Sequence, residues 1–291
     1  MILVTTPTGR TGNIILKTLI ERGEKVRVLA RKPERISPDV AAKIEVSKGS
    51  LLEKSDLTTA LAGCESLYFC IPESNTHDGI NYYENFAKIA ADAIRESDVK
   101  RIVYLSGGGK NTKLNAGIAL GLHKAEDVLA ESGAALRALR CPVFFESLLY
   151  QIEPITRAGM FFMPMSGDYK APQVAAQDIA DVAVKWLMDK SWNDTKGVGV
   201  HGAENISYNE IAAAMSLAMN KTIRFQQVTR HDYIKTLLGI GSSEAFANAL
   251  TDMFEAIPQG LYEMEKRTSE TTTATSIHDW LEHSFLPKIK S

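Results

Sequence analysis

The residues with the clearest chemical use form the turn Thr6-Pro7-Thr8-Gly9-Arg10-Thr11-Gly12, between an apolar run and a helix-like segment. The first turn of a helix offers unpaired N–H groups and a partial positive charge to an anion, and glycines let the backbone approach a pyrophosphate closely. Thr6 stands where such a turn usually has its first glycine. We predict a dinucleotide-binding turn formed by Thr6, Thr8, Gly9, Arg10, Thr11 and Gly12. An ordinary strand-to-helix turn is the alternative.

Arg31 and Lys32 end the second apolar run, where an NAD-selective protein usually carries an acid for the ribose 2′-hydroxyl. No acid stands there, and a guanidinium pairs with a phosphate through two parallel hydrogen bonds. We therefore expect Arg31 to bind the 2′-phosphate of NADP(H), with Arg10 and Lys32 as helpers. A solvated basic loop is the alternative interpretation.

The elements that must position these residues alternate between strands and helices, and this alternation predicts a parallel sheet. Strand-like runs begin at Ile2, Val26, Ile44, Leu67, Arg101 and about Leu136. Helical spacing is found over 14–20, 57–61, 86–94 and about 123–132. Six strands joined by five crossovers predict an α/β protein with a doubly wound parallel sheet of the Rossmann type.

The pattern changes after Cys141-Pro142, where longer helices are separated by short strands. We predict a dinucleotide-binding domain over residues 1–141 and a smaller, mostly helical substrate region over residues 142–291, partly interleaved with the first. Met and Phe residues gather at 160–165, a pattern more typical of core packing than of a pocket.

Composition excludes several classes for this chain of 291 residues, which is 45% hydrophobic and 23% charged. A formal net charge of −2 gives no overall basic field for nucleic acid, so no nucleic-acid partner is expected. Three cysteines without metal-ligand spacing favour a reducing compartment and no metal site. Apolar runs stay shorter than the about 18 residues that a membrane span needs, and no leader precedes Ile2. We expect a cytoplasmic protein without a membrane anchor, whose oligomeric state the sequence leaves open.

The sequence resembles the NmrA-like family, an atypical branch of the short-chain dehydrogenase/reductase superfamily, over nearly its whole length. The resemblance rests on the order of spaced segments: 8–12, 26–31, 60–64, 101–106, 129–133, 140–146 and 178–180. It implies a Rossmann domain that binds NADP(H) and a small domain that closes a cleft above the nicotinamide. It also implies that Ile71-Pro72 approach the nicotinamide ribose, that the Gly49-Ser50-Leu51 turn approaches the adenine, and that Ser106 belongs to the cofactor site.

The superfamily uses a Tyr general acid four residues before a Lys, because the Lys cation lowers the pKa of the phenol. Ungapped alignment of the helix that ends at Gly133 places Ile118 and Leu122 at these positions, so the pair is missing. Some relatives carry a His at the start of this helix. His123, with Lys124 beside it, is therefore our candidate for the catalytic polar group, and a plain helix-start His is the alternative.

Hydride transfer to a quinone, a dye cation or an activated alkene needs no protein acid, since water can supply the proton. By the resemblance, an apolar cleft would be lined by Phe144, Phe145, Glu146 and Tyr150. Glu73 and His77 follow the fourth strand, at the edge where open sheets bind ligands, but we favour a solvated loop for them over a role in binding. We expect an NADPH-dependent reductase of a small apolar or aromatic acceptor, a quinone-like molecule being the first guess. The alternative is a non-catalytic NADP(H) sensor, and a sugar-nucleotide epimerase is a distant third because it too needs the missing Tyr.

Overall fold

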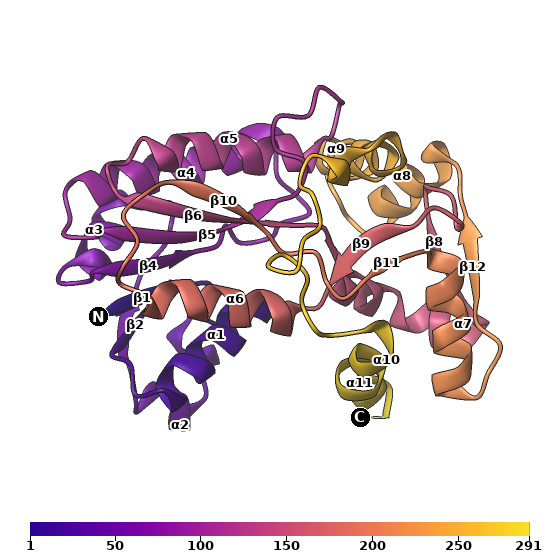
Figure 1. The fold of residues 1–291 in the computed structure, drawn as a ribbon, viewed down its shortest axis with the longest axis horizontal. Helices are drawn as coiled ribbons and strands as arrows, with labels where there is room; N and C mark the ends of the chain where they lie inside the picture. Colours follow the sequence, from indigo (N-terminus) through magenta and orange to yellow (C-terminus); the bar gives the residue numbers. More distant parts are fainter. Residues whose placement is uncertain (291) are drawn as a thin grey trace.

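A seven-stranded parallel sheet forms the centre of the computed structural model, which describes residues 1–290 (Figure 1). The strand order is β10-β6-β5-β4-β1-β2-β3. The strands are β1 (Ile2–Thr5), β2 (Val26–Ala30), β3 (Glu45–Lys48), β4 (Ser66–Phe69), β5 (Arg101–Gly107), β6 (Ala135–Cys141) and β10 (Lys196–Gly199). The predicted doubly wound fold is confirmed, with β10 as a seventh strand. The order reverses between β1 and β4, and open parallel sheets bind ligands at the carboxyl ends of the strands beside such a reversal. We refer to this part of the sheet edge as the crevice.

Alternate residues of each strand enter two different cores, as the period of two in a strand requires. Leu3 and Ile102 pack under one layer of helices, whereas Val4 and Val103 pack under the other. The first layer holds α3 (Lys54–Leu61), α4 (Ile80–Arg95) and α5 (Ile118–Ala130), and the second holds α1 (Arg10–Glu21) and α6 (Ala176–Met188). A short α2 (Pro38–Ala41) leads into β3.

The remaining chain forms a cap, residues 142–175 and 200–290, with its own apolar core (Figure 1). Its strands are β7 (Val143–Phe144), β8 (Met160–Met163), β9 (Ala171–Val174), β11 (Asn205–Ile206) and β12 (Arg224–Gln227). Its helices are α7 (Tyr208–Met219), α8 (Arg230–Gly239), α9 (Glu244–Ala256), α10 (Ile277–Trp280) and α11 (Leu286–Lys290). Between β9 and β11 the chain returns to the main sheet as α6 and β10. Ser291, the last residue of the region predicted to begin at 142, lies outside the described residues.

Helix α5 begins at Ile118 rather than near His123, so the prediction that His123 lies at a helix start is wrong. The start is set by Gly117, whose φ of 46° is left-handed. A Cβ at Gly117 would lie 1.8 Å from the carbonyl oxygen of Ala249, so α9 also packs against this backbone. Sequence periodicity does not show this start, because the first turn of α5 is shared between two cores: Ile118 packs toward the sheet, whereas Leu120 packs toward the cap.

The C-terminal strap, which we define as residues 264–276, connects the segment after α9 to α10 and crosses between the two halves of the molecule (Figure 1). Asp178 at the start of α6 accepts hydrogen bonds from Thr273 and Thr275. Glu265 lies 3.4 Å from Arg140 in β6 of the main sheet. The strap therefore joins the cap to the main sheet.

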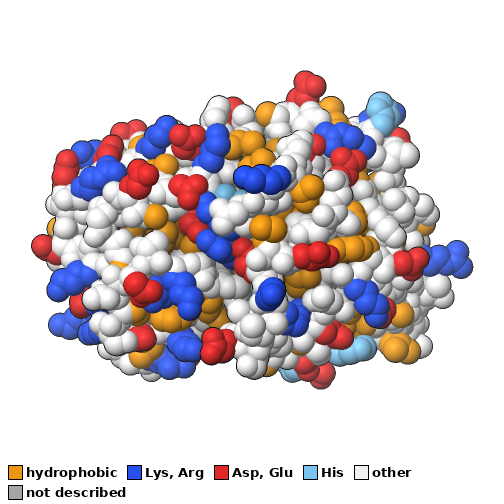
Figure 2. Space-filling model, turned by 45° about the horizontal axis from the view of Figure 1, so that its top comes forward, with side chains coloured by type: hydrophobic (Ala, Val, Ile, Leu, Met, Phe, Trp, Pro, Cys, Tyr) orange, Lys and Arg blue, Asp and Glu red, His pale blue; other side chains and the backbone are white. Residues whose placement is uncertain are grey.

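Charges of both signs are interspersed over the face drawn in Figure 2, which agrees with the small net charge. Over residues 1–290, none of the helices is long and apolar enough to span a bilayer.

Candidate functional site

The β1–α1 turn has the shape that close approach of an anion requires. Thr6 adopts a left-handed φ of 48°, the conformation that a glycine would adopt most easily, and its carbonyl oxygen accepts the N–H of Gly9 at 2.9 Å. A Cβ at Gly12 would lie 2.2 Å from the same carbonyl oxygen. Gly12 therefore lets α1 pack directly against the end of β1.

The N-terminus of α1 has no side-chain cap, since Gly9 precedes it and its first turn contains no acid. The helix follows the carboxyl end of β1, which lies beside β4 in the sheet. Thr5 pins these two strands together there, because its hydroxyl donates to the carbonyl oxygen of Tyr68 and accepts the N–H of Cys70. The buried Thr11 hydroxyl lies 2.8 Å from the Tyr68 hydroxyl, and Thr8 is exposed. This rigid turn is a ready-made anion site.

Arg31 and Lys32 are exposed directly after β2, at the same edge of the sheet. None of the carboxylates that the structure describes forms an ion pair with either side chain. Arg10, the expected helper, instead donates to the carbonyl oxygen of Glu146 at 2.6 Å. Arg31 and Lys32 are thus the basic side chains left open at the end of β2.

The turn after β3 is held by an acid that the sequence did not single out. The N–H of Ser50 donates to Asp56 Oδ2 at 2.9 Å, and Gly49 donates to the carbonyl oxygen of Ala30. Asp56 lies in α3, six residues after Ser50. The position of the turn is therefore fixed relative to β2, although Ser50 itself carries no charge.

The segment after β4 is buried more deeply than its polar residues suggested. Ile71 is buried, and the carbonyl oxygen of Pro72 accepts the hydroxyl of Tyr82 at 2.7 Å. His77, expected in a solvated loop, is buried and stacks on Tyr82 with ring centroids 4.6 Å apart. Ser243 at the start of α9 donates to the carbonyl oxygen of His77, so the cap holds this loop.

His123 faces the backbone at the end of β5. Its Nε2 lies 3.1 Å from the carbonyl oxygens of both Gly107 and Gly108. Because carbonyl oxygens only accept hydrogen bonds, Nε2 must carry a proton and donate it. Burial is the main cause that lowers the pKa of His123, so the ring stays neutral at neutral pH. This geometry suits positioning of the glycine loop, which we define as residues 107–109, better than proton donation.

Lys124 points to the outside of the domain. It is exposed, and its Nζ lies 3.8 Å from Glu84 Oε2 on α4. Leu122 packs against Gly107, where an added Cβ would lie 3.1 Å from Leu122 Cδ1. The wall that α5 presents to the end of β5 is apolar at this point.

A network of buried polar side chains also supports the glycine loop. Ser106 donates to Glu126 at 3.0 Å, and Arg140 donates to the same carboxylate at 2.6 Å. Glu265 of the strap lies 3.4 Å from Arg140 and accepts the N–H of Gly109 at 2.7 Å. The Ser106 hydroxyl thus uses its proton within this network.

The predicted substrate residues after β6 belong mostly to the packing of the cap. Phe145 is buried against Trp280, with ring centroids 5.6 Å apart, and Phe144 is half-buried in β7. The Glu146 carboxylate accepts the N–H of Ala176 at the start of α6 and the indole N–H of Trp280. Burial raises the pKa of Glu146. The carboxylate therefore secures the cap to α6 and does not face the crevice.

Tyr150, a residue after β7, contacts two residues of the main domain, Arg10 and Glu73. Its ring lies under the Arg10 guanidinium, 4.5 Å from the ring centroid, and its hydroxyl donates to Glu73 Oε2 at 2.8 Å. Desolvation of the hydroxyl and the neighbouring Glu73 raise the pKa of Tyr150 to about 12, so it stays protonated. Sequence reasoning named these three residues separately and could not join them, because no local pattern links positions so far apart.

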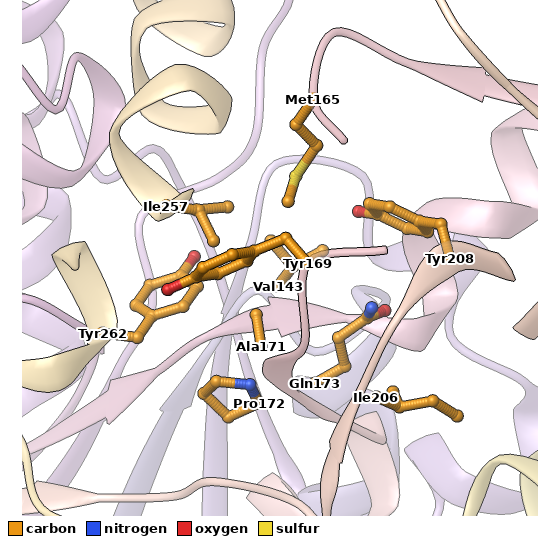
Figure 3. A pocket seen from close by; sticks show the side chains of 10 residues that line it. All are labelled: Val143, Met165, Tyr169, Ala171, Pro172, Gln173, Ile206, Tyr208, Ile257 and Tyr262. Atoms are coloured by element: carbon orange, nitrogen blue, oxygen red, sulfur yellow. The ribbon is translucent and has the colours of Figure 1, made fainter. Parts of the chain in front are cut away.

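A small aromatic pocket lies in the cap beside the glycine loop (Figure 3). Its lining residues are Val143, Met165, Tyr169, Ala171, Pro172, Gln173, Ile206, Tyr208, Ile257 and Tyr262. Figure 3 shows the Gln173 amide pointing into the space between Tyr208 and Tyr169, and its Oε1 is buried without a hydrogen-bond partner. Tyr262 also touches the glycine loop, since a Cβ at Gly108 would lie 2.9 Å from Tyr262 Cδ1. Sequence reasoning missed this pocket because its residues come from distant segments.

Comparison with known proteins gives one family and several distant relatives. The family model described as the NmrA-like family matches residues 1–281. An NAD(P)H azoreductase of Xenophilus azovorans is 26% identical over 258 residues, which are 89% of this chain and 87% of that protein. Quinone oxidoreductase 2 of Escherichia coli is 24% identical over 286 residues, which are 95% of this chain and 97% of that protein.

The same fold is found in solved structures. The E. coli NADPH-dependent quinone oxidoreductase complexed with NADPH matches with a TM-score of 0.83 and 21% identity over 98% of this chain and 100% of its own. The Citrobacter sp. triphenylmethane reductase complexed with NADP(H) matches with a TM-score of 0.80 and 18% identity over the same shares. At these identities the likeness establishes the fold alone.

Proposed function

Since the chain belongs to the NmrA-like family, we propose that it is an NAD(P)H-dependent reductase that passes a hydride from NADPH to a small apolar or aromatic acceptor, with a quinone as the first candidate. The observation that carries the proposal is the uncapped N-terminus of α1, where Gly12 packs against the carbonyl oxygen of Thr6 in the crevice between β1 and β4. Relatives named for quinone, azo and triphenylmethane acceptors support the same class of reaction.

The residues of this edge fit a dinucleotide phosphate. The first N–H groups of α1 would bind the pyrophosphate, because no side chain of the described residues caps them and they carry the positive end of the helix dipole. Arg31 would bind the 2′-phosphate, with Lys32 as a second cation. The bound cofactor supplies the hydride.

The acceptor would lie between the glycine loop and the aromatic pocket of Figure 3. Tyr262 contacts Gly108 and also lines the pocket, so its ring would form a wall of both the acceptor site and the pocket. Leu122 and Tyr262 give the loop apolar neighbours, and the neutral His123 holds its carbonyl groups. Such surroundings exclude water and orient a flat ring, and bulk water would supply the proton to the reduced acceptor. This arrangement favours quinone-like or dye acceptors over a carbonyl that needs a positioned acid.

Oxidation of NADPH with an acceptor panel tests the proposal. We expect turnover with a quinone, an azo dye or a triphenylmethane dye cation, and little with a simple ketone. Calorimetric titration with NADPH and NADH should accompany the assay. Tight NADPH binding without turnover of any acceptor would favour the alternative, an NADP(H) sensor. Failure to bind either nucleotide would contradict both functions.

A further inference from the structure

Three segments far apart in sequence meet through Arg10, Glu73 and Tyr150. The Arg10 guanidinium lies 4.5 Å from the ring centroid of Tyr150, and the Tyr150 hydroxyl donates to Glu73 Oε2 at 2.8 Å. Arg10 is the first residue of α1, Glu73 follows β4 and Tyr150 belongs to the cap. Both ends of the Tyr150 side chain are therefore held by the main domain.

These contacts lie along the course that a dinucleotide would take across the sheet. Its pyrophosphate would lie at the N-terminus of α1, where Arg10 is, and its nicotinamide half would lie beyond β4, where Glu73 follows Ile71 and Pro72. A side chain that bridges Arg10 and Glu73 therefore spans the same part of the edge as the middle of the cofactor.

Tyr150 is not held in place by packing. It is 65% exposed, so the cation–π contact and one hydrogen bond are what define its position. Contacts of this kind at an exposed site are weak and reversible. Arg10 keeps a separate hydrogen bond to the carbonyl oxygen of Glu146, so the turn remains held when Tyr150 moves.

We propose that Arg10, Glu73 and Tyr150 form a clasp over the cofactor groove, which NADP(H) passes only when Tyr150 swings away. The inference rests on the proposed function, because it assumes that a dinucleotide occupies this edge. A clasp that is closed both with and without ligand slows entry and exit by the same factor and leaves the equilibrium affinity nearly unchanged.

Stopped-flow fluorescence of NADPH binding, without any acceptor, tests the clasp. For Tyr150→Ala we expect association and dissociation rates to rise together by about tenfold, the factor that about 1.4 kcal/mol of barrier gives at 25 °C. The dissociation constant should change less than about twofold. Tyr150→Phe keeps the ring over Arg10 but loses the bond to Glu73, so its rates should rise less. Glu73→Ala should raise the two rates by the same factor as Tyr150→Phe. The variant that combines Glu73→Ala with Tyr150→Phe should have the same rates as either single variant.

Leu217→Ala is the matched control, because Leu217 is 79% exposed on α7 and has no contact with the clasp. Faster dissociation with unchanged association would overturn the clasp, since Tyr150 would then only contribute binding contacts. Equal rates in all variants would overturn it as well. If the unsubstituted chain does not bind NADPH, the proposed function fails first, which keeps the two failures distinct. Tyr150→Phe keeps the test valid if Tyr150→Ala does not fold.

Discussion

The backbone of Thr6 and the Cα of Gly12 are in such close contact that a Cβ on Gly12 would lie 2.2 Å from the Thr6 carbonyl oxygen. A backbone oxygen cannot rotate away as a side chain can, so the helix would have to move. This contact holds the start of α1 close to the end of β1, as the proposed pyrophosphate site requires.

Gly12→Ala should therefore weaken NADPH binding by at least about tenfold and lower the free energy of unfolding by about 1–3 kcal/mol, the usual cost of overpacking. Calorimetric titration and urea denaturation measure the two effects. Gly239→Ala is the control, because an added Cβ there has no neighbour within 4 Å and lies in a helix. It should be neutral or slightly stabilising. Unchanged affinity in a folded Gly12→Ala would contradict the anion site.

Thr6→Gly should stabilise the protein by about 1 kcal/mol. A left-handed conformation costs a non-glycine residue about 1–2 kcal/mol, and the Thr6 hydroxyl is buried without a hydrogen-bond partner. Part of the gain is offset by the greater chain entropy of glycine in the unfolded state. Chemical denaturation measures the change, with the exposed Thr8→Gly as the comparison. Destabilisation by Thr6→Gly would mean that the Thr6 side chain has a partner in solution.

Arg31→Ala should weaken NADPH binding by roughly tenfold to a hundredfold and leave NADH binding nearly unchanged, because only NADPH carries the 2′-phosphate. Titration calorimetry with both nucleotides measures the difference. Arg22→Ala, an exposed arginine at the opposite end of α1, should change neither. If Arg31→Ala lost the same factor of affinity for NADPH and for NADH, another residue would determine the preference for NADPH.

His123→Gln should keep turnover within about threefold, since an amide N–H can still donate to the carbonyl oxygens of Gly107 and Gly108. His123→Ala should lower stability by about 1–3 kcal/mol, because two buried carbonyl groups lose a donor. Steady-state NADPH oxidation and thermal denaturation test the pair. A loss of about a hundredfold in both variants would instead indicate a general acid.

His201 should make the protein less stable as the pH falls. It is buried after β10, and burial, followed by the Arg267 charge, lowers its pKa to about 4. An unfolded His has a pKa of about 6.5, so the unfolded state binds more protons between pH 4 and 6.5. The free energy of unfolding therefore contains the full contribution of neutral His201 above pH 6.5. It falls by up to about 3 kcal/mol as the pH decreases toward 4.

His201→Gln should flatten this part of the pH dependence in urea denaturation at a series of pH values. His231→Gln, which changes an exposed residue of α8, should leave the slope as it is. An identical slope for His201→Gln and the unsubstituted chain would show that His201 does not contribute.

The sequence by itself determined the family, the sheet and the place of the β1–α1 turn. These follow from local patterns: apolar runs of strand length, helical spacing, and glycines directly after a strand. The alternation of Leu3 and Val4 between two cores is already present in the apolar run, because a strand turns successive side chains to opposite faces. Arg31 could be named for the same reason, since it directly follows a recognisable strand.

Only the tertiary structure decided which side chains meet. Glu146, expected to face the cleft, accepts the N–H of Ala176, and Arg10, expected near Arg31, contacts Tyr150. The roles of His123 and of the cofactor residues stay predictions, although the structure places His123 in the second turn of α5 because Gly117 starts that helix against α9. Partners separated by 30 residues, as Glu146 and Ala176 are, or by 136, as Arg10 and Glu146 are, leave no periodic trace in the sequence. Their distances are set by the way the cap folds back onto the sheet, which depends on packing across the whole chain.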